Sequence, residues 1–154
     1  MTTINFYILS AQKKLIPFVC QLTQTVLQKS NDGLLILAPT ALIEPLDDML
    51  WSFESTAFIP HGIITAEQSA TFAKTRFNPL QAILTNQPQL TDDFTGLVMN
   101  LTNEPLLSLI EKHTISKLLE IIAHDELSVL HGRQKFRTYR DMPISPAIQT
   151  FHIT

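Results

Sequence analysis

The sequence predicts an α/β fold, a three-layer sandwich in which helices cover both faces of a mainly parallel sheet. Two observations predict it. Short apolar runs such as residues 34–38 (LLILA) lack polar alternation, which is typical of strands buried on both faces. These runs alternate with segments of helical periodicity, as in sheets whose parallel strands are joined by crossover helices. With 154 residues, 45% of them hydrophobic, the chain is expected to form one domain, residues 1–154.

The expected strands are short runs rich in apolar and β-branched side chains. They are residues 4–9, 34–38, 80–85 and 96–101. Apart from 80–85, residues 52–90 are expected to be irregular. Pro143 and Pro146 end the last helix, and residues 144–154 after it are expected to be irregular or an edge strand.

Helices are expected where apolar residues recur every three or four positions. These segments are residues 12–29, 40–51, 106–122 with a break near His113, and 125–140. Pro17 is compatible only with the first turn of a helix, so regular helix can begin later than Gln12. Asp125 is a favourable N-cap residue, and we interpret the cluster of His124, Asp125 and Glu126 as a helix start.

The charges are unevenly distributed. The chain has 11 Lys and Arg and 14 Asp and Glu, a net charge of −3. Residues 131–140 carry four basic residues and no acid, so the other residues carry 7 − 14 = −7. A protein that binds nucleic acid through its phosphates needs a broad basic surface, and this distribution argues against one. One basic segment in an acidic protein is better suited to a local acidic ligand.

Nucleotide, metal and catalytic sites have no positive signal. The four glycines match neither G-x-G-x-x-G nor G-x-x-x-x-G-K-[ST], so the fold is expected to be Rossmann-like without a nucleotide-binding loop. No two histidines have H-x-x-x-H spacing, no G-x-S-x-G elbow occurs, and Cys20 is interpreted as a core residue. We therefore expect no catalytic residue, no metal and no cofactor.

The expected location is the cytoplasm. No apolar run reaches the roughly 18–20 residues of a membrane span, so no membrane partner is expected. At the N-terminus the apolar residues precede Lys13 and Lys14, which is the reverse of the order in a signal peptide. A single cysteine excludes an internal disulfide.

The basic segment has helical spacing. Arg133, Phe136, Arg137 and Arg140 stand at i, i+3, i+4 and i+7 and share one stripe. Guanidinium groups beside an aromatic ring suit a ligand with carboxylates next to an apolar side chain. A second interpretation stays open, in which Phe136 turns to the core and the arginines form a solvated face.

A second aromatic feature lies in the middle of the chain. Trp51, the single tryptophan, ends an expected helix, and Phe58-Ile59-Pro60-His61 follows. Aromatic side chains beside a loop rigidified by proline are plausible interface anchors. A core tryptophan that covers the edge of the sheet is the alternative.

Together these features resemble the chi subunit family of the bacterial DNA polymerase III holoenzyme. The resemblance rests on Asn5-Phe6-Tyr7-Ile8-Leu9, on Leu50-Trp51 with Phe58-Ile59-Pro60-His61, and on residues 133–140 (RQKFRTYR). It covers most of the chain, but residues 63–90 match poorly. Two departures stand in the last helix, where Val129 replaces a frequent lysine and Phe136 replaces a more usual tyrosine.

The resemblance implies a non-catalytic adaptor that reaches DNA only indirectly. Members of the family pair with the psi subunit of the clamp-loader complex and bind the C-terminal tail of single-stranded DNA-binding protein. That tail is acidic and ends in Pro-Phe. Carried over to this chain, the residues implied to bind the tail are Arg133, Phe136, Arg137 and Arg140, with Trp51 and Phe58 beside an apolar pocket.

Two other functions remain as alternatives. The chain could be a nucleotide-binding or hydrolytic α/β enzyme, which a thermal-shift screen with nucleotides would reveal. It could also bind nucleic acid directly through the basic helix, although the charge of −7 elsewhere disfavours this.

Overall fold

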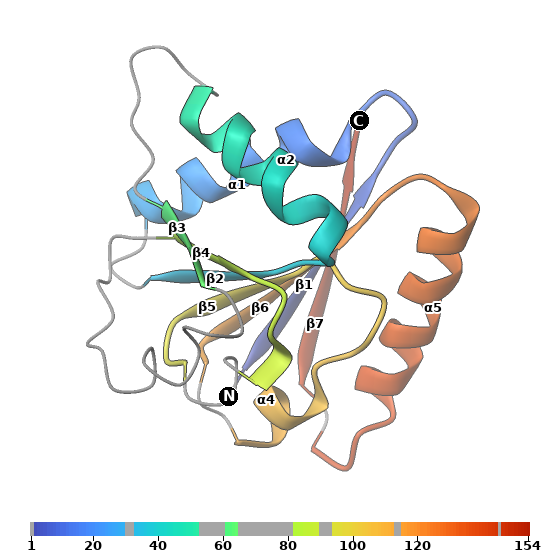
Figure 1. Cartoon of the computed structure of the whole chain (residues 1–154). Coiled ribbons are helices and arrows are strands. Elements are labelled where there is room, and N and C mark those ends of the chain that lie inside the picture. Colours follow the sequence, from blue (N-terminus) through green and yellow to red (C-terminus); the bar gives the residue numbers. More distant parts are fainter. Residues whose placement is uncertain are drawn as a thin grey trace.

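The computed structural model contains a parallel sheet with helices on both faces (Figure 1). It describes residues 2–29, 33–52, 61–64, 82–89, 94–112, 115–144 and 146–154. Within these residues seven strands form one sheet in the order β3-β4-β2-β5-β6-β1-β7, and every pairing is parallel. The predicted α/β class and the mainly parallel sheet are confirmed.

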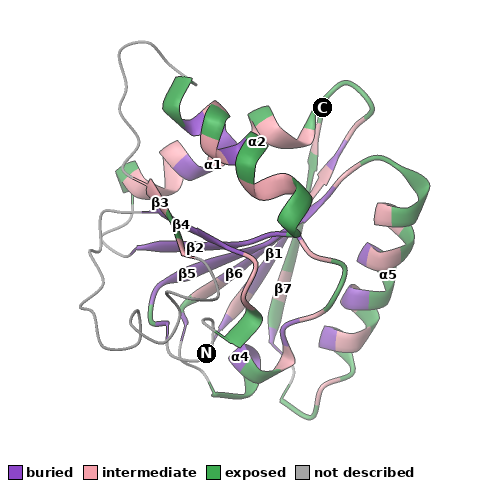
Figure 2. Ribbon diagram, viewed as in Figure 1, coloured by how far each residue is buried: buried purple, intermediate pink, exposed green. Residues whose placement is uncertain are grey.

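The strands are short, and those in the centre are buried on both faces. Their bounds are β1 Thr3–Leu9, β2 Leu34–Leu37, β3 His61–Ile64, β4 Ala82–Thr85, β5 Leu97–Asn100, β6 Lys117–Ile122 and β7 Ala147–Ile153. All four residues of β2, of β4 and of β5 are buried (Figure 2). Burial on both faces explains why these strands show continuous apolar runs rather than alternation.

The helices form two layers. Their bounds are α1 Leu15–Lys29, α2 Thr40–Ser52, α4 Leu107–Lys112 and α5 Glu126–Arg140. On one face of the sheet, Val19 and Cys20 of α1 and Leu46 of α2 share a core cluster with Ile36. On the other face, the clustered residues come from α4 and α5, with Phe6 and Leu118 from the strands. Two helical layers around one sheet make the predicted three-layer sandwich (Figure 1).

Most predicted boundaries are close to the observed ones. The helix α1 begins at Leu15, so Pro17 lies in its first turn, where a missing backbone N–H costs little. Pro45, however, lies inside α2, as the sixth residue of that helix. Cys20 is buried as predicted, and its burial raises the pKa of the thiol to about 12. A thiol held in this protonated state is a packing residue rather than a nucleophile.

The prediction of a helix over residues 106–122 is wrong in its second half. The helix α4 ends at Lys112, and Lys117–Ile122 forms strand β6 between β5 and β1. Because β6 has a strand on each side and helices on each face, apolar residues occupy both of its faces, as Leu118, Leu119, Ile121 and Ile122 do. A pattern of this kind matches helical spacing as well as strand spacing, so periodicity alone cannot distinguish them.

The two outermost strands also add to the prediction. The strand β3 was not predicted, because its four residues lie in a segment without clear period. The strand β7 confirms the edge-strand alternative for the C-terminal segment. It pairs in parallel with β1 over seven positions, from Thr3↔Ala147 to Leu9↔Ile153.

Candidate groove beside the basic helix

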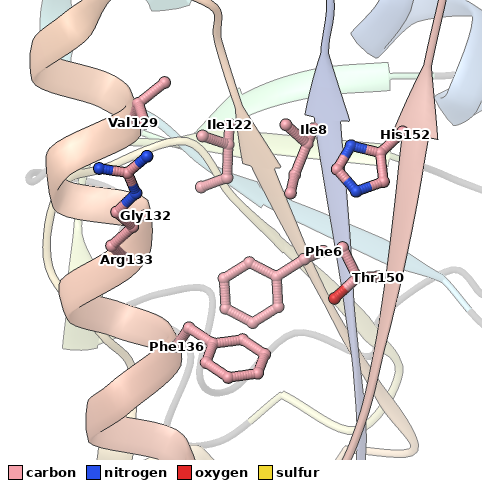
Figure 3. Close-up of a pocket in the computed structure, with 9 residues that line it drawn as sticks. All are labelled: Phe6, Ile8, Ile122, Val129, Gly132, Arg133, Phe136, Thr150 and His152. Carbon is pink, nitrogen blue, oxygen red and sulfur yellow. The ribbon is translucent and has the colours of Figure 1, made fainter.

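A groove of about 400 Å³ lies between α5 and the strands that α5 covers (Figure 3). Most of its lining is apolar, and polar groups come from three residues. The lining residues are Phe6, Ile8, Ile122, Val129, Gly132, Arg133, Phe136, Thr150 and His152. In Figure 3 Arg133 comes from the helix on one side, and Thr150 and His152 come from β7 on the other.

The register of the sheet assembles the floor of the groove. Side chains two apart on a strand point to the same face, so Phe6 and Ile8 share one face of β1. The parallel register pairs Phe6 with Thr150 and Ile8 with His152, which places these β7 residues on that face as well. The lining of the groove therefore extends from β1 onto the edge strand.

Gly132 sets how close α5 comes to the sheet. A Cβ atom at this position would lie 2.9 Å from Cδ1 of Ile122 and 3.0 Å from its Cγ2. These separations are shorter than ordinary carbon contacts, so a larger residue would move the helix or Ile122. The close approach at Gly132 seats the helix over β6, next to the part of the sheet that forms the groove.

Phe136 combines the two interpretations that its spacing allowed. It is half-buried and packs against the core, where its ring makes an edge contact with Phe6 at 5.6 Å and 61°. It also lines the groove (Figure 3). The aromatic ring of the predicted stripe is therefore one wall of an apolar hollow, as a ligand with an apolar side chain would require.

The three arginines of the stripe are exposed but differ in position. Arg133 lines the groove, whereas Arg137 and Arg140 continue along the same helix outside its lining. Nε of Arg140 donates to Oδ1 of Asp141 at 3.1 Å, and both side chains are well exposed. An exposed pair of this kind contributes little to stability. Arg133 is therefore the cation best placed to act together with the apolar lining.

Lys135, counted in the basic segment, does not belong to its surface. Its side chain is 3% exposed, and its Nζ lies 2.9 Å from Oε1 of Glu120 and donates to the carbonyl of Thr102. Tyr139 and Asn100 donate to the other carboxylate oxygen of Glu120, at 2.6 and 3.0 Å. The surface stripe thus has three cations, and the fourth is neutralised inside the protein.

Burial governs the titration of this internal cluster. Desolvation raises the pKa of the Glu120 carboxyl, although Lys135, Tyr139 and Asn100 act in the opposite direction. The pKa of Tyr139 is also raised, first by burial and then by the nearby carboxylate. Its hydroxyl accepts a hydrogen bond from the N–H of Leu106 at 2.9 Å while it donates to Glu120. These contacts tie the inner side of α5 to β6 and to the loop after β5.

Trp51 lies at the end of α2, in the other helical layer. Its side chain is 61% exposed and meets the ring of His61 edge-on, with centroids 4.9 Å apart. Nε2 of His61 lies 3.1 Å from Oδ1 of Asp47. The structure thus joins Trp51 to His61, as their grouping in the sequence suggested. It does not bring Trp51 to the arginines, because α2 and α5 cover opposite faces of the sheet (Figure 1).

Phe58 lies outside the residues that the structure describes, so its predicted place beside an apolar pocket is untested. Of the predicted tail-binding residues, Arg133 and Phe136 meet at the groove. The prediction missed the groove residues on β1, β6 and β7. The apolar side chains of Phe6 and Ile8, two positions apart, could have indicated the floor of the groove. They gave no information on which strand pairs with β1.

Two further findings concern the part of the chain that the structure describes. No group of three or more His, Cys, Asp and Glu side chains there could hold a metal ion. In the same residues, no helix has both the length and the apolar character needed to cross a membrane.

Known proteins resemble this chain over nearly its whole length. The family model described as DNA polymerase III chi subunit, HolC, matches residues 1–146. A relative from Pseudomonas aeruginosa, DNA polymerase III subunit chi, is 26% identical over 146 residues, which cover 92% of this chain and 91% of the relative. The match includes the basic helix and all groove residues except Thr150 and His152. The chain therefore belongs to the DNA polymerase III chi subunit family.

Proposed function

We propose that the chain is a non-catalytic accessory subunit of DNA polymerase III that acts in DNA replication. In this role its α5 groove holds the acidic C-terminal tail of single-stranded DNA-binding protein. One observation carries the proposal: an apolar groove of about 400 Å³ has a guanidinium group, that of Arg133, in its lining. Apolar volume beside a cation matches a ligand that ends in an aromatic residue with a free carboxylate.

The groove divides the recognition between two kinds of contact. The terminal phenylalanine of the tail fills the apolar part against Phe136, Phe6 and Val129. Arg133 pairs with the terminal carboxylate, because a guanidinium fork matches a carboxylate with two parallel hydrogen bonds. Arg137 and Arg140 lie farther along the stripe and meet the preceding acidic residues of the tail. Val129, which replaces a lysine frequent in the family, adds apolar wall in place of charge.

The position of Trp51 supports a second interface for the psi subunit. Trp51 belongs to the layer opposite the groove and exposes 61% of its side chain. Exposed tryptophan is enriched among residues that dominate binding energy in protein interfaces. Two partners on opposite layers can be held at the same time, as an adaptor between the clamp loader and the DNA-binding protein requires. Trp51 is thus removed from the tail site and assigned to this second surface.

The charges of the groove predict how tail binding responds to salt. Arg133, Arg137 and Arg140 are exposed, and exposed ion pairs weaken as salt screens them. The apolar contact is not screened in this way. Affinity is therefore expected to fall with salt and to level off rather than vanish.

The experiment is a titration of a fluorescent acidic peptide ending in Pro-Phe against the wild-type chain and Arg133→Ala. Loss of a hydrogen-bonded charge is expected to cost about 1.5–3 kcal/mol, a loss in affinity of roughly 10- to 150-fold. Lys29→Ala at the end of α1 removes the same charge outside the groove and is the matched control. Equal affinity of Arg133→Ala and Lys29→Ala would contradict the proposed tail site.

A test of the second surface keeps the two proposals separate. Trp51→Ala is expected to weaken the complex with the psi subunit and to leave peptide affinity unchanged. Arg133→Ala is expected to do the opposite. Loss of peptide binding in Trp51→Ala would return Trp51 to the tail site.

A further inference from the structure

The groove has a polar wall that does not belong to the basic helix. Thr150 and His152 of β7 line it opposite Arg133, and the apolar side chains of Ile8 and Ile122 lie between the two walls (Figure 3). Both β7 residues are exposed. Within the groove lining, His152 and Arg133 are the two side chains able to carry positive charge. A ligand in the groove is therefore flanked by a fixed cation on one side and a titratable one on the other.

We propose that His152 is a second anchor for the carboxylates of the tail and makes its binding depend on pH. This inference rests on the proposed function, since it concerns the same groove and the same acidic ligand. It adds a residue from a different element, the edge strand β7. The chemistry is that of an acidic peptide with a free C-terminal carboxylate, whose negative groups lie beside both walls once its aromatic side chain fills the hollow.

The register explains why His152 faces the ligand. His152 pairs with Ile8 of β1, and Ile8 lies in the groove lining. Its neighbours Phe151 and Ile153 point to the opposite face of the strand, where Phe151 stacks on Tyr7 with centroids 5.3 Å apart. The helix α5 stops short of covering β7, so the imidazole remains open to solvent and to a ligand (Figure 3).

The ionisable groups around His152 determine the sign of the effect. From α5 the charged group in the lining is Arg133, whereas β1 and β6 contribute uncharged Phe6, Ile8 and Ile122. No acid of the described chain is in that lining. Imidazole changes charge between pH 5 and 8, and a bound carboxylate favours its protonated form. Tail affinity is therefore expected to be highest near pH 6 and to fall as the pH rises to 8.

The test measures the affinity of the acidic Pro-Phe peptide at pH 6 and pH 8 with five chains. Wild type is expected to bind about two- to fivefold more tightly at pH 6, as for an exposed ion pair. His152→Gln removes the imidazole, so it should bind the peptide equally at both pH values, with the weaker affinity that wild type has at pH 8. His152→Lys should also bind equally at both pH values, but with the tighter affinity that wild type has at pH 6. His131→Ala, on the side of α5 away from the groove by helical geometry, should behave as wild type.

Arg133→Ala is the fifth chain and separates the two proposals. If wild type binds the peptide and Arg133→Ala does not, the tail site stands. An unchanged pH dependence in His152→Gln would then overturn the role of His152 alone. If wild type fails to bind at either pH, the proposed function falls and the role of His152 falls with it.

Discussion

The two sides of α5 meet the sheet in different ways. On one side, which we call the filled side, Lys135 and Tyr139 donate hydrogen bonds to Glu120. Asn100 also donates to Glu120, Lys135 donates to the carbonyl of Thr102, and the N–H of Leu106 donates to Tyr139. On the other side Arg133 and Phe136 border an apolar groove of about 400 Å³ that extends onto β7. Arg133 and Lys135 are two positions apart, which turns them about 200° from each other on a helix. One cation is therefore structural and the other is available to a ligand.

The comparison shows that charge in a sequence segment does not measure charge on a surface. Lys135 is 3% exposed, and its charge is balanced by Glu120, which is fully buried. Such a pair gains little net stability over apolar packing, but removal of one partner leaves the other charged and buried. The filled side therefore holds α5 in place, whereas the side with Arg133 and the groove is open to a ligand.

Glu120→Ala is expected to destabilise the protein by about 3–5 kcal/mol, because it leaves Lys135 buried without a counter-charge. Tyr139 and Asn100 lose an acceptor at the same time. Urea denaturation measures the change. Glu111→Ala, an exposed acid on α4, is the control and should shift stability by less than about 0.5 kcal/mol. A loss below about 1 kcal/mol for Glu120→Ala would show that the filled side does not hold the helix.

Thr150→Trp is expected to block the groove without harm to the fold. The indole would occupy space otherwise filled by the aromatic side chain of a ligand, whose burial is worth about 1.5–3 kcal/mol. Peptide affinity should therefore fall by more than about tenfold. The change in unfolding free energy should stay small, because Thr150 is exposed on an edge strand.

Gln149→Trp is the matched control for this variant. Gln149 is also exposed, adjoins Thr150 on β7 and points to the other face of the strand. It should leave peptide affinity unchanged, as measured by fluorescence anisotropy. Similar affinities for the two tryptophan variants would exclude the groove as the binding site.

Asp125→Ala is expected to have the smallest effect, about 1 kcal/mol of stability, through loss of the α5 N-cap. Oδ2 of Asp125 accepts from the N–H of Ser128 at 3.0 Å, and Oδ1 accepts from the Ser128 hydroxyl at 2.7 Å. These hydrogen bonds lower the pKa of Asp125. An acid with a lowered native pKa stabilises the fold fully above its unfolded pKa of about 3.9. That contribution is lost as the pH falls through the lower native value.

The difference between wild type and Asp125→Ala should therefore be constant near neutral pH and shrink in acid. Chemical denaturation at pH 7 and at pH 3 measures it. Asp125→Asn keeps a capping group without the charge, so it should retain most of the stability at pH 7 without that pH dependence. A wild-type advantage over Asp125→Ala that grows in acid would contradict the role of the cap.

Local patterns predicted much of this protein. The N-cap at Asp125, the stripe of Arg133 and Phe136 and the runs of β1 and β2 depend on neighbours in the chain. The error at residues 106–122 arose where local information was ambiguous, since the apolar run of β6 has the features of both a strand and a helix. The position of Trp51 depended on which face α2 covers, and this is a property of the whole sheet.

The α/β class and the basic stripe could be predicted from the sequence, because each depends on residues close together in the chain. The resemblance to the chi subunit family could also be recognised there, because it rests on short motifs such as residues 133–140. Three features depend instead on the tertiary structure: Lys135 is buried against Glu120, Trp51 lies away from Arg133, and Thr150 and His152 complete the groove. These features depend on the parallel pairing of β7 with β1 and on the close packing of α5 against β6. Contacts of this kind join distant segments, so the energetics of packing decide them rather than local periodicity.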